Sequence, residues 1–165
     1  PFGRGKAVWG GATGLANKLV SGWTLSGIST FMTGAPFSPS CSTSVQGSVC
    51  GRPDVVGGSA LYPSNQTIAQ WFNAAAFKMS PDFTYGNAAY NLLWGPGRQN
   101  WDASLAKNTY ITERLNLQLR LDAFGAFNNP QFSTPSATIT NTSTVGKISS
   151  ASGNRTMQIG AKLQF

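Results

Sequence analysis

The chain of 165 residues contains no histidine and few charged side chains. Histidine is the commonest general base and a frequent metal ligand, so its absence argues against acid–base catalysis and against a metal site. Charged residues make up 10% of the sequence, whereas typical soluble domains contain about 25%. With 41% hydrophobic residues the chain is nevertheless too apolar for disorder. We therefore expect a folded chain without enzymatic activity, metal or cofactor, one surface of which meets a medium other than water.

Two other patterns are missing from the sequence. The net charge is +7, but the basic residues are spread from Arg4 to Lys162 without a cluster. A nucleic-acid interface normally shows a basic stripe or run, so we do not expect one here. No apolar run approaches the roughly 18 residues of a membrane helix, which excludes a helical span. The chain opens on Pro1, and we expect it to be part of a longer protein.

The clearest pattern that is present is an alternation at the carboxy-terminal end, in residues 154–165. Its apolar residues share one parity, at Met157, Ile159, Ala161, Leu163 and Phe165, and the other parity holds Gln158, Gly160, Lys162 and Gln164. Successive side chains of a strand point to opposite faces, so the pattern predicts a strand with one apolar and one polar face. About 11 residues of alternation are enough for a tilted strand to cross a bilayer.

This last strand ends in a pattern that resembles the carboxy-terminal assembly signal of bacterial outer-membrane β-barrels. The resemblance depends on Gln158, Gly160, Leu163 and Phe165. In that family the final strand and its terminal aromatic residue are recognised by the barrel assembly machinery, which the resemblance therefore implies as a partner. A strand of a soluble sandwich can alternate as well, but the position of this pattern at the chain end favours a barrel.

Three further strands are predicted, at 22–34, 100–111 and 115–127. The third of these alternates without a break, with apolar residues at Leu115, Leu117, Leu119, Leu121 and Ala123. The first alternates imperfectly, because Ile28 and Met32 fall on the polar parity. Lys107 lies on the apolar parity of the second strand, close to its end, where a long stem can carry the charge to an interface. A tight turn at 112–114 is expected to join the second and third strands.

Two long connections separate these strands, at 35–98 and 128–153. The first is rich in aromatic residues, so we expect it to be ordered, with a short helix at 64–77. That helix would begin at Ser64 or Asn65 and carry Ile68, Trp71, Phe72 and Ala75 on one face. Both long connections fall at one end of the predicted sheet and the short connections at the other. This asymmetry is typical of outer-membrane barrels, whose extracellular loops are long and periplasmic turns short.

The chain also resembles, over essentially its whole length, the carboxy-terminal end of Oar-like TonB-dependent outer-membrane receptors. The matching stretches are P-F-G-R-G-K at Pro1, G-W-T-L-S-G-I at Gly22, T-G-A-P-F at Thr33, G-R-P-D at Gly51, W-F-N-A-A-A-F at Trp71, G-P-G-R-Q-N-W-D at Gly95, L-R-L-D-A-F-G-A-F-N-N-P-Q-F at Leu119, and the terminal strand. Such receptors are similar to transporters with 22-stranded plugged barrels.

The resemblance implies that residues 1–165 are the carboxy-terminal part of a receptor barrel in the bacterial outer membrane. The expected fold class is all-β: an antiparallel membrane β-barrel segment of about four strands, which forms an open sheet if isolated. Residues 35–98 and 128–153 would be long outer loops. The implied partners are outer-membrane lipid, the remainder of the barrel with its plug, and TonB through an amino-terminal part that this sequence does not contain. Transport would therefore be a property of the parent receptor.

Few residues in the sequence are candidates for a chemical site. The two cysteines, Cys41 and Cys50, predict a disulfide inside the first long connection if the compartment is oxidising. Asp102 and Asp122 could form a carboxylate pair, but we expect Asp122 to pair with Arg120 or with a base on a neighbouring strand. Four loop aromatics could face a ligand: Trp71, Phe72, Tyr85 and Trp94. The interpretation that we favour is that the loop aromatics pack a small core of the loop itself.

Two functions of different classes are compatible with these patterns. The first is uptake or recognition of an extracellular ligand as part of a TonB-dependent receptor. The alternative is a secreted or surface-exposed β-rich adhesin or carbohydrate-binding module, in which the leucines of 115–121 would cover a soluble core. The resemblance favours the receptor, and dependence on detergent would separate the two.

Overall fold

The computed structural model describes residue 7, residue 11 and residues 14–42 and 51–165 of the chain. It consists of two compact units. The first is built from Pro1–Thr30, Gln99–Asn129 and Gly153–Phe165, and the second from Phe31–Arg98 and Pro130–Ser152. The second unit therefore corresponds closely to the two long connections of the sequence.

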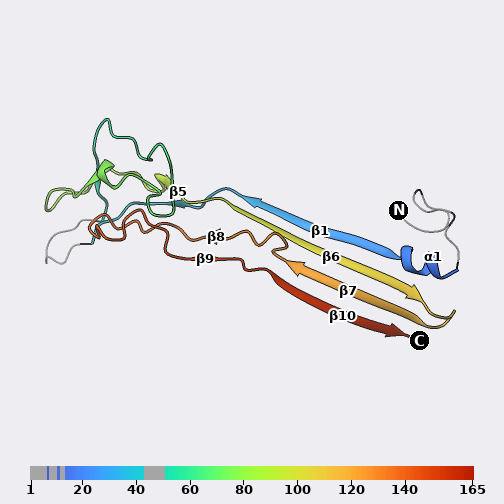
Figure 1. Ribbon diagram of the computed structural model, residues 1–165. Helices are drawn as coiled ribbons and strands as arrows, with labels where there is room; N and C mark the ends of the chain where they lie inside the picture. Colours follow the sequence, from blue (N-terminus) through green and yellow to red (C-terminus); the bar gives the residue numbers. More distant parts are fainter. Residues whose placement is uncertain (1–6, 8–10, 12–13, 43–50) are drawn as a thin grey trace. The chain divides into compact units, whose positions relative to one another are not determined.

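The first unit is a four-stranded antiparallel sheet with the strand order β1-β6-β7-β10 (Figure 1). Its strands are β1 (Trp23–Met32), β6 (Arg98–Tyr110), β7 (Asn116–Phe124) and β10 (Thr156–Gln164), and the short helix α1 (Gly14–Val20) precedes β1. All four strands predicted from the alternation are present. The helix lies in the Gly-rich opening of the chain, for which no helix or strand was predicted.

The strand ends differ from the predicted ones where the backbone forms turns. The expected turn at 112–114 is confirmed, because the Ile111 N–H donates to the Leu115 carbonyl at 2.9 Å and closes the hairpin between β6 and β7. β7 stops at Phe124, three residues before the predicted end. Gly125 takes a φ of 61°, and the Asn128 N–H donates to its carbonyl at 2.7 Å. A positive φ does not fit an extended strand, so residues 125–127 form a turn.

The register sorts the side chains of the sheet onto two faces. Leu121 of β7 stands between Leu105 of β6 and Ile159 of β10, whereas Asp122 stands between Ser104 and Gln158. Because side chains alternate along each strand, every second position shares the face of Leu121. The alternation read from the sequence therefore becomes one continuous apolar face and one continuous polar face.

The described residues of the second unit form three two-stranded ribbons and a small core. The ribbons pair β2 (Pro36–Phe37) with β5 (Leu93–Trp94), β3 (Asp54–Val55) with β4 (Phe77–Lys78), and β8 (Gln131–Phe132) with β9 (Ala151–Ser152). The core consists of Phe37, Phe72, Ala76, Phe77 and Leu93, with Val55, Leu61, Tyr62, Leu92, Ala137, Ile139 and Val145 packed against it. The centroid of the Phe72 ring lies 5.9 Å from those of Phe37 and Phe77. The expectation of an ordered loop is thus confirmed.

Both long connections contribute to this unit, and they are joined by backbone hydrogen bonds. The Trp71 N–H donates to the Gly146 carbonyl at 2.8 Å, and the Ile148 N–H donates to the Ile68 carbonyl at 2.8 Å. Ser40 and Thr138 form a parallel β-bridge. Residues far apart in sequence therefore share one core, which neither connection could build alone.

The helix predicted at 64–77 is wrong. Only a three-residue 3₁₀ helix, η1 (Ala74–Ala76), is present, and its N-cap is Asn73, whose side chain accepts a hydrogen bond from the Ala75 N–H at 3.2 Å. The Trp71 and Asn73 N–H groups donate to the carbonyls of Gly146 and Leu61, so they are not available for helical hydrogen bonds. Within the described part of the chain, no helix is long and apolar enough to cross a membrane.

Candidate functional site

The apolar face of the sheet is uncovered. Its side chains come from all four strands and are Trp23, Leu25, Phe31, Ala103, Leu105, Leu117, Leu119, Leu121, Ala123, Met157, Ile159, Ala161 and Leu163. The exposed fractions reach 76% at Leu25 and 81% at Ile159. Contiguous apolar surface of this extent marks an interaction site on a folded protein. The sheet is therefore built to meet an apolar medium or partner outside the described residues.

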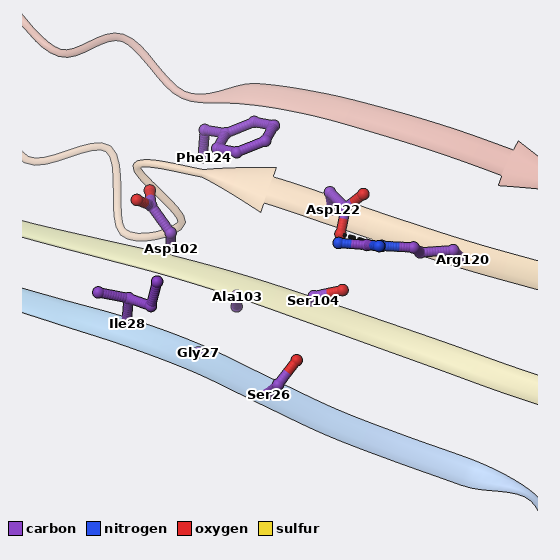
Figure 2. Close-up of a pocket in the computed structure, with 9 residues that line it drawn as sticks. All are labelled: Ser26, Gly27, Ile28, Asp102, Ala103, Ser104, Arg120, Asp122 and Phe124. Carbon is purple, nitrogen blue, oxygen red and sulfur yellow. Dashed lines mark hydrogen bonds and ion pairs between the residues drawn. The ribbon is translucent and has the colours of Figure 1, made fainter.

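The polar face carries a pocket of about 250 Å³. It is lined by Ser26, Gly27, Ile28, Asp102, Ala103, Ser104, Arg120, Asp122 and Phe124 (Figure 2). Within it the Nε atom of Arg120 lies 2.8 Å from Oδ1 of Asp122, so the predicted pairing of these two residues is confirmed. Ile28 lies here among polar groups, as its position on the polar parity predicts.

Asp102 forms its hydrogen bonds with Gly125 and Asn100 and does not pair with Asp122. Its Oδ1 atom accepts hydrogen bonds from the Gly125 N–H at 2.9 Å and from Nδ2 of Asn100 at 3.0 Å. Each aspartate therefore has hydrogen-bond donors of its own within the sheet, which is the behaviour of structural carboxylates. The absence of catalysis stays a prediction.

One charged side chain, Lys107, projects from the apolar face. Its Nζ atom donates to the backbone carbonyls of Lys18, Leu19 and Ser21 at 2.8, 3.0 and 2.9 Å. It also lies 4.9 Å from the centroid of the Trp23 ring. The stem thus carries the charge to the carboxy-terminal end of α1, where backbone carbonyls lack helical partners.

The four predicted ligand-facing aromatics do not form one surface. Phe72 is fully buried in the core of the second unit, which confirms the favoured interpretation of a loop core and shows that a ligand-facing ring is wrong for this residue. Trp71 is half-buried, and its Nε1 donates to the Trp94 carbonyl at 2.8 Å. Trp94 and Tyr85 are exposed, at 53% and 79%. For these three residues, contact with a ligand stays a prediction.

Two further exposed aromatic residues in the same unit were not among the predicted ligand-facing residues. Phe83 and Tyr90 are 82% and 74% exposed. Phe83 has a φ of 62°, a conformation that bulky side chains rarely adopt. The guanidinium carbon of Arg52 lies 5.1 Å from the centroid of the Tyr90 ring. The signal was available in the sequence, because Phe83, Tyr85 and Tyr90 follow one another closely between a proline and an asparagine.

A hollow of about 590 Å³ in the second unit was also missed. It is lined by Ser42, Ser136, Thr138, Thr140, Asn141 and Thr142. These are hydroxyl and carboxamide groups without charge, which can donate and accept hydrogen bonds. The sequence showed only a Ser/Thr-rich connection here, since Ser42 reaches the others through the packing of two connections.

Two further predictions concern the loop cysteines and the chain end. Cys41 is disulfide-bonded, but Cys50 lies outside the described residues, so the pairing of the two stays a prediction. In the assembly signal, Gln158 and Gly160 lie on the polar face of β10 and Leu163 on the apolar face. Phe165 follows the strand and is fully exposed.

Comparison with protein families shows to which family the chain belongs. The model of the outer membrane beta barrel domain matches residues 1–158. The chain belongs to this family. Comparison with curated proteins and with solved structures gives no match.

As an outer membrane β-barrel domain, the chain is located in the bacterial outer membrane. Barrels of this class turn an apolar band toward lipid and a polar surface toward the interior. The exposed leucines and isoleucine of the sheet are therefore the lipid-facing surface, and the Arg120–Asp122 pair lies on the interior surface. An edge strand in lipid would leave backbone groups without hydrogen bonds, so the outer edges of β1 and β10 require further strands.

Proposed function

We propose that this barrel domain is the carboxy-terminal segment of a TonB-dependent receptor that recognises or takes up an extracellular ligand. Family membership supports the barrel and its location. The receptor assignment is supported by the resemblance of the motifs along the chain to Oar-like receptors. In this proposal, residues 35–98 and 128–153 are the outer loops, and the hairpin between β6 and β7 faces the periplasm.

The observation that carries the proposal is the ordered unit formed by the two long connections. Loops that only join barrel strands need no common core, and long ordered loops are usually functional. Here Phe72 and Leu93 are fully buried, and backbone hydrogen bonds join residues 68–71 to residues 146–148. This supports a rigid recognition surface, on which Tyr85 and the hydroxyl-lined hollow are ligand-accessible.

The proposed role of the ligand-facing surface is binding without chemical conversion. The chain has no histidine, and both aspartates of the polar face have structural hydrogen bonds. No observation favours the alternative of a secreted adhesin or carbohydrate-binding module, because a membrane barrel accounts for the uncovered apolar face.

A binding experiment with TonB tests the receptor assignment. The natural protein is extracted from outer membranes in a mild detergent and passed over the immobilised periplasmic domain of TonB from the same cells. A receptor is retained, while a porin from the same extract serves as the unretained control. Lack of retention of a protein that still shows the heat-modifiable mobility of a folded barrel would exclude the TonB-dependent function. The outer membrane location would not be affected by that result.

A further inference from the structure

Lys107 is the only charged residue on the lipid-facing surface of the four strands, all of which the structure describes. Its neighbours on that surface include Leu105 on the same strand and Leu119 opposite it. A lysine charge in contact with hydrocarbon is costly unless it is paired or reaches the interface. The position of Lys107 therefore needs an explanation that the barrel fold alone does not supply.

The ammonium group of Lys107 is satisfied by α1. Three backbone carbonyls, those of Lys18, Leu19 and Ser21, accept its hydrogen bonds at 2.8–3.0 Å. These carbonyls belong to the carboxy-terminal end of the helix, which carries partial negative charge. The face of the Trp23 ring, 4.9 Å from Nζ, adds a cation–π contact. The lysine charge and the helix end thus compensate each other.

The residues around this contact have the chemistry of a membrane interface. Nε1 of Trp23 donates to the Leu19 carbonyl at 2.9 Å, while the side chain remains 43% exposed. Leu19 is 69% exposed. Tryptophan with its N–H engaged and its ring exposed is enriched at membrane–water boundaries. A lysine with its stem along an apolar surface and its charge at the edge is typical of the same depth.

We propose that the last turn of α1 is an interfacial anchor, held against the lipid-facing surface by Lys107 and in contact with outer-membrane lipid at the headgroup–acyl boundary. Lipid is the occupant because the Leu19 carbonyl is bound by both Lys107 and Trp23, and these two residues share the face of Leu25 and Leu105, which the barrel already turns to lipid. The inference depends on membership of the barrel family and not on the receptor assignment. Its site is the rim nearest the β6–β7 hairpin, where α1 lies in Figure 1.

Spin labelling of the natural protein reconstituted in phospholipid vesicles tests the lipid contact. A nitroxide is attached at Leu19→Cys, with Ile159→Cys as the lipid-facing reference and Glu113→Cys in the hairpin as the aqueous reference. The proposal predicts that the label at position 19 is more accessible to oxygen than the label at position 113. It also predicts that the label at position 19 is more accessible to a water-soluble nickel chelate than the label at position 159. Accessibilities equal to those of position 113 would overturn it, because α1 would then lie in water. Protection from both reagents would overturn it as well, because another protein segment would then cover the helix.

Trypsin tests the role of Lys107. The ammonium group of Lys107 binds the Lys18 carbonyl, which belongs to the Lys18–Leu19 peptide bond, and trypsin cleaves this bond. Lys107→Met keeps the length of the side chain and removes the charge. Loss of charge-assisted hydrogen bonds should speed release of the fragment beginning at Leu19 by about tenfold. The matched control is Lys162→Met, on the polar face of β10, and Lys107→Arg should restore protection. Cleavage of Lys107→Met at the unmodified rate would overturn the proposal. If Lys107→Met does not assemble, the spin label in the otherwise unmodified protein decides.

Discussion

Oδ1 of Asp102 accepts a hydrogen bond from the backbone N–H of Gly125 at 2.9 Å. This contact joins β6 to the turn that follows β7. The Ala126 N–H donates to the Trp101 carbonyl at 2.7 Å beside it, and the rings of Trp101 and Phe127 meet edge to face at 5.6 Å between centroids. The turn at 125–127 is therefore fixed to the neighbouring strand by backbone, side-chain and aromatic contacts at once.

Replacement of Asp102 by alanine should destabilise this end of the sheet. The part-buried Gly125 N–H would lose its partner, which costs about 1 kcal/mol. Asp102→Asn retains an oxygen acceptor and is the matched control. Unfolding in urea, followed by the loss of heat-modifiable mobility in detergent, measures the difference. Equal midpoints for the two variants would show that the hydrogen bond to Gly125 contributes nothing.

Replacement of Gly86 by alanine should disrupt the second unit and leave the sheet intact. A Cβ atom at this position would collide with the backbone oxygens of Arg52 and Pro53, which cannot move independently of β3. Gly57→Ala is the control, because its Cβ would meet nothing within 4 Å. We expect faster proteolysis within residues 51–98 for Gly86→Ala only, with an unchanged yield of heat-modifiable barrel. Unchanged proteolysis would contradict the packing described for this unit.

An arginine on the lipid-facing surface should impair the barrel, whereas one on the interior surface should not. Leu121 lies between Leu105 and Ile159 on the apolar face. A basic residue in the middle of the lipid-facing band costs about 2–4 kcal/mol. Gln118→Arg, on the polar face of the same strand, is the matched control. The fraction of protein that reaches the heat-modifiable folded form should fall for Leu121→Arg alone, and an equal fall in both variants would contradict the assignment of the two faces.

Replacement of Phe165 by serine should reduce assembly of the barrel into the outer membrane, although it removes no packing contact among the described residues. The side chain of Phe165 is fully exposed, so its removal leaves no cavity among the described residues. An effect on assembly would therefore arise from recognition of the chain end. We expect less folded protein in the outer membrane after a pulse of synthesis, and Phe165→Tyr should retain the level of the unmodified protein. An unchanged level for Phe165→Ser would count against an assembly signal.

The predicted Cys41–Cys50 disulfide should resist alkylation in the native, unreduced protein. Mass spectrometry should find both cysteines modified only after reduction. A bridge that closes a loop of this length contributes about 2–3 kcal/mol by the chain-entropy estimate, so reduction should also lower the resistance of the second unit to proteolysis. Alkylation of both thiols without prior reduction would exclude the bridge.

The four long strands could be predicted from the sequence because their signal is local. Alternation in 115–123 requires only that successive side chains face opposite sides, and the register then places Leu121 beside Leu105 and Ile159. The ends of the strands were less predictable. Residues 125–127 continue the aromatic pattern of β7, yet Gly125 turns the chain because Asp102 of another strand binds its N–H group.

The candidate site was predictable only in part. Pairing of Arg120 with Asp122 followed from two residues of the same parity on one strand, whereas the burial of Phe72 did not follow from any local pattern. Its surroundings come from both long connections, and the hydrogen bond from the Trp71 N–H to the Gly146 carbonyl is incompatible with the helix that the spacing of 64–77 predicted.

The sequence pattern by itself determined the sheet and its two faces, because a period of two is a property of neighbouring residues, whereas the membrane as its environment followed from the match to the outer membrane beta barrel family. Only the tertiary structure decided how the long connections pack together and which carbonyl groups bind the ammonium group of Lys107. Those outcomes depend on hydrogen bonds and contacts between residues distant in the chain, such as Ile68 with Ile148 and Lys107 with Lys18. No short window of sequence contains both partners of such a contact.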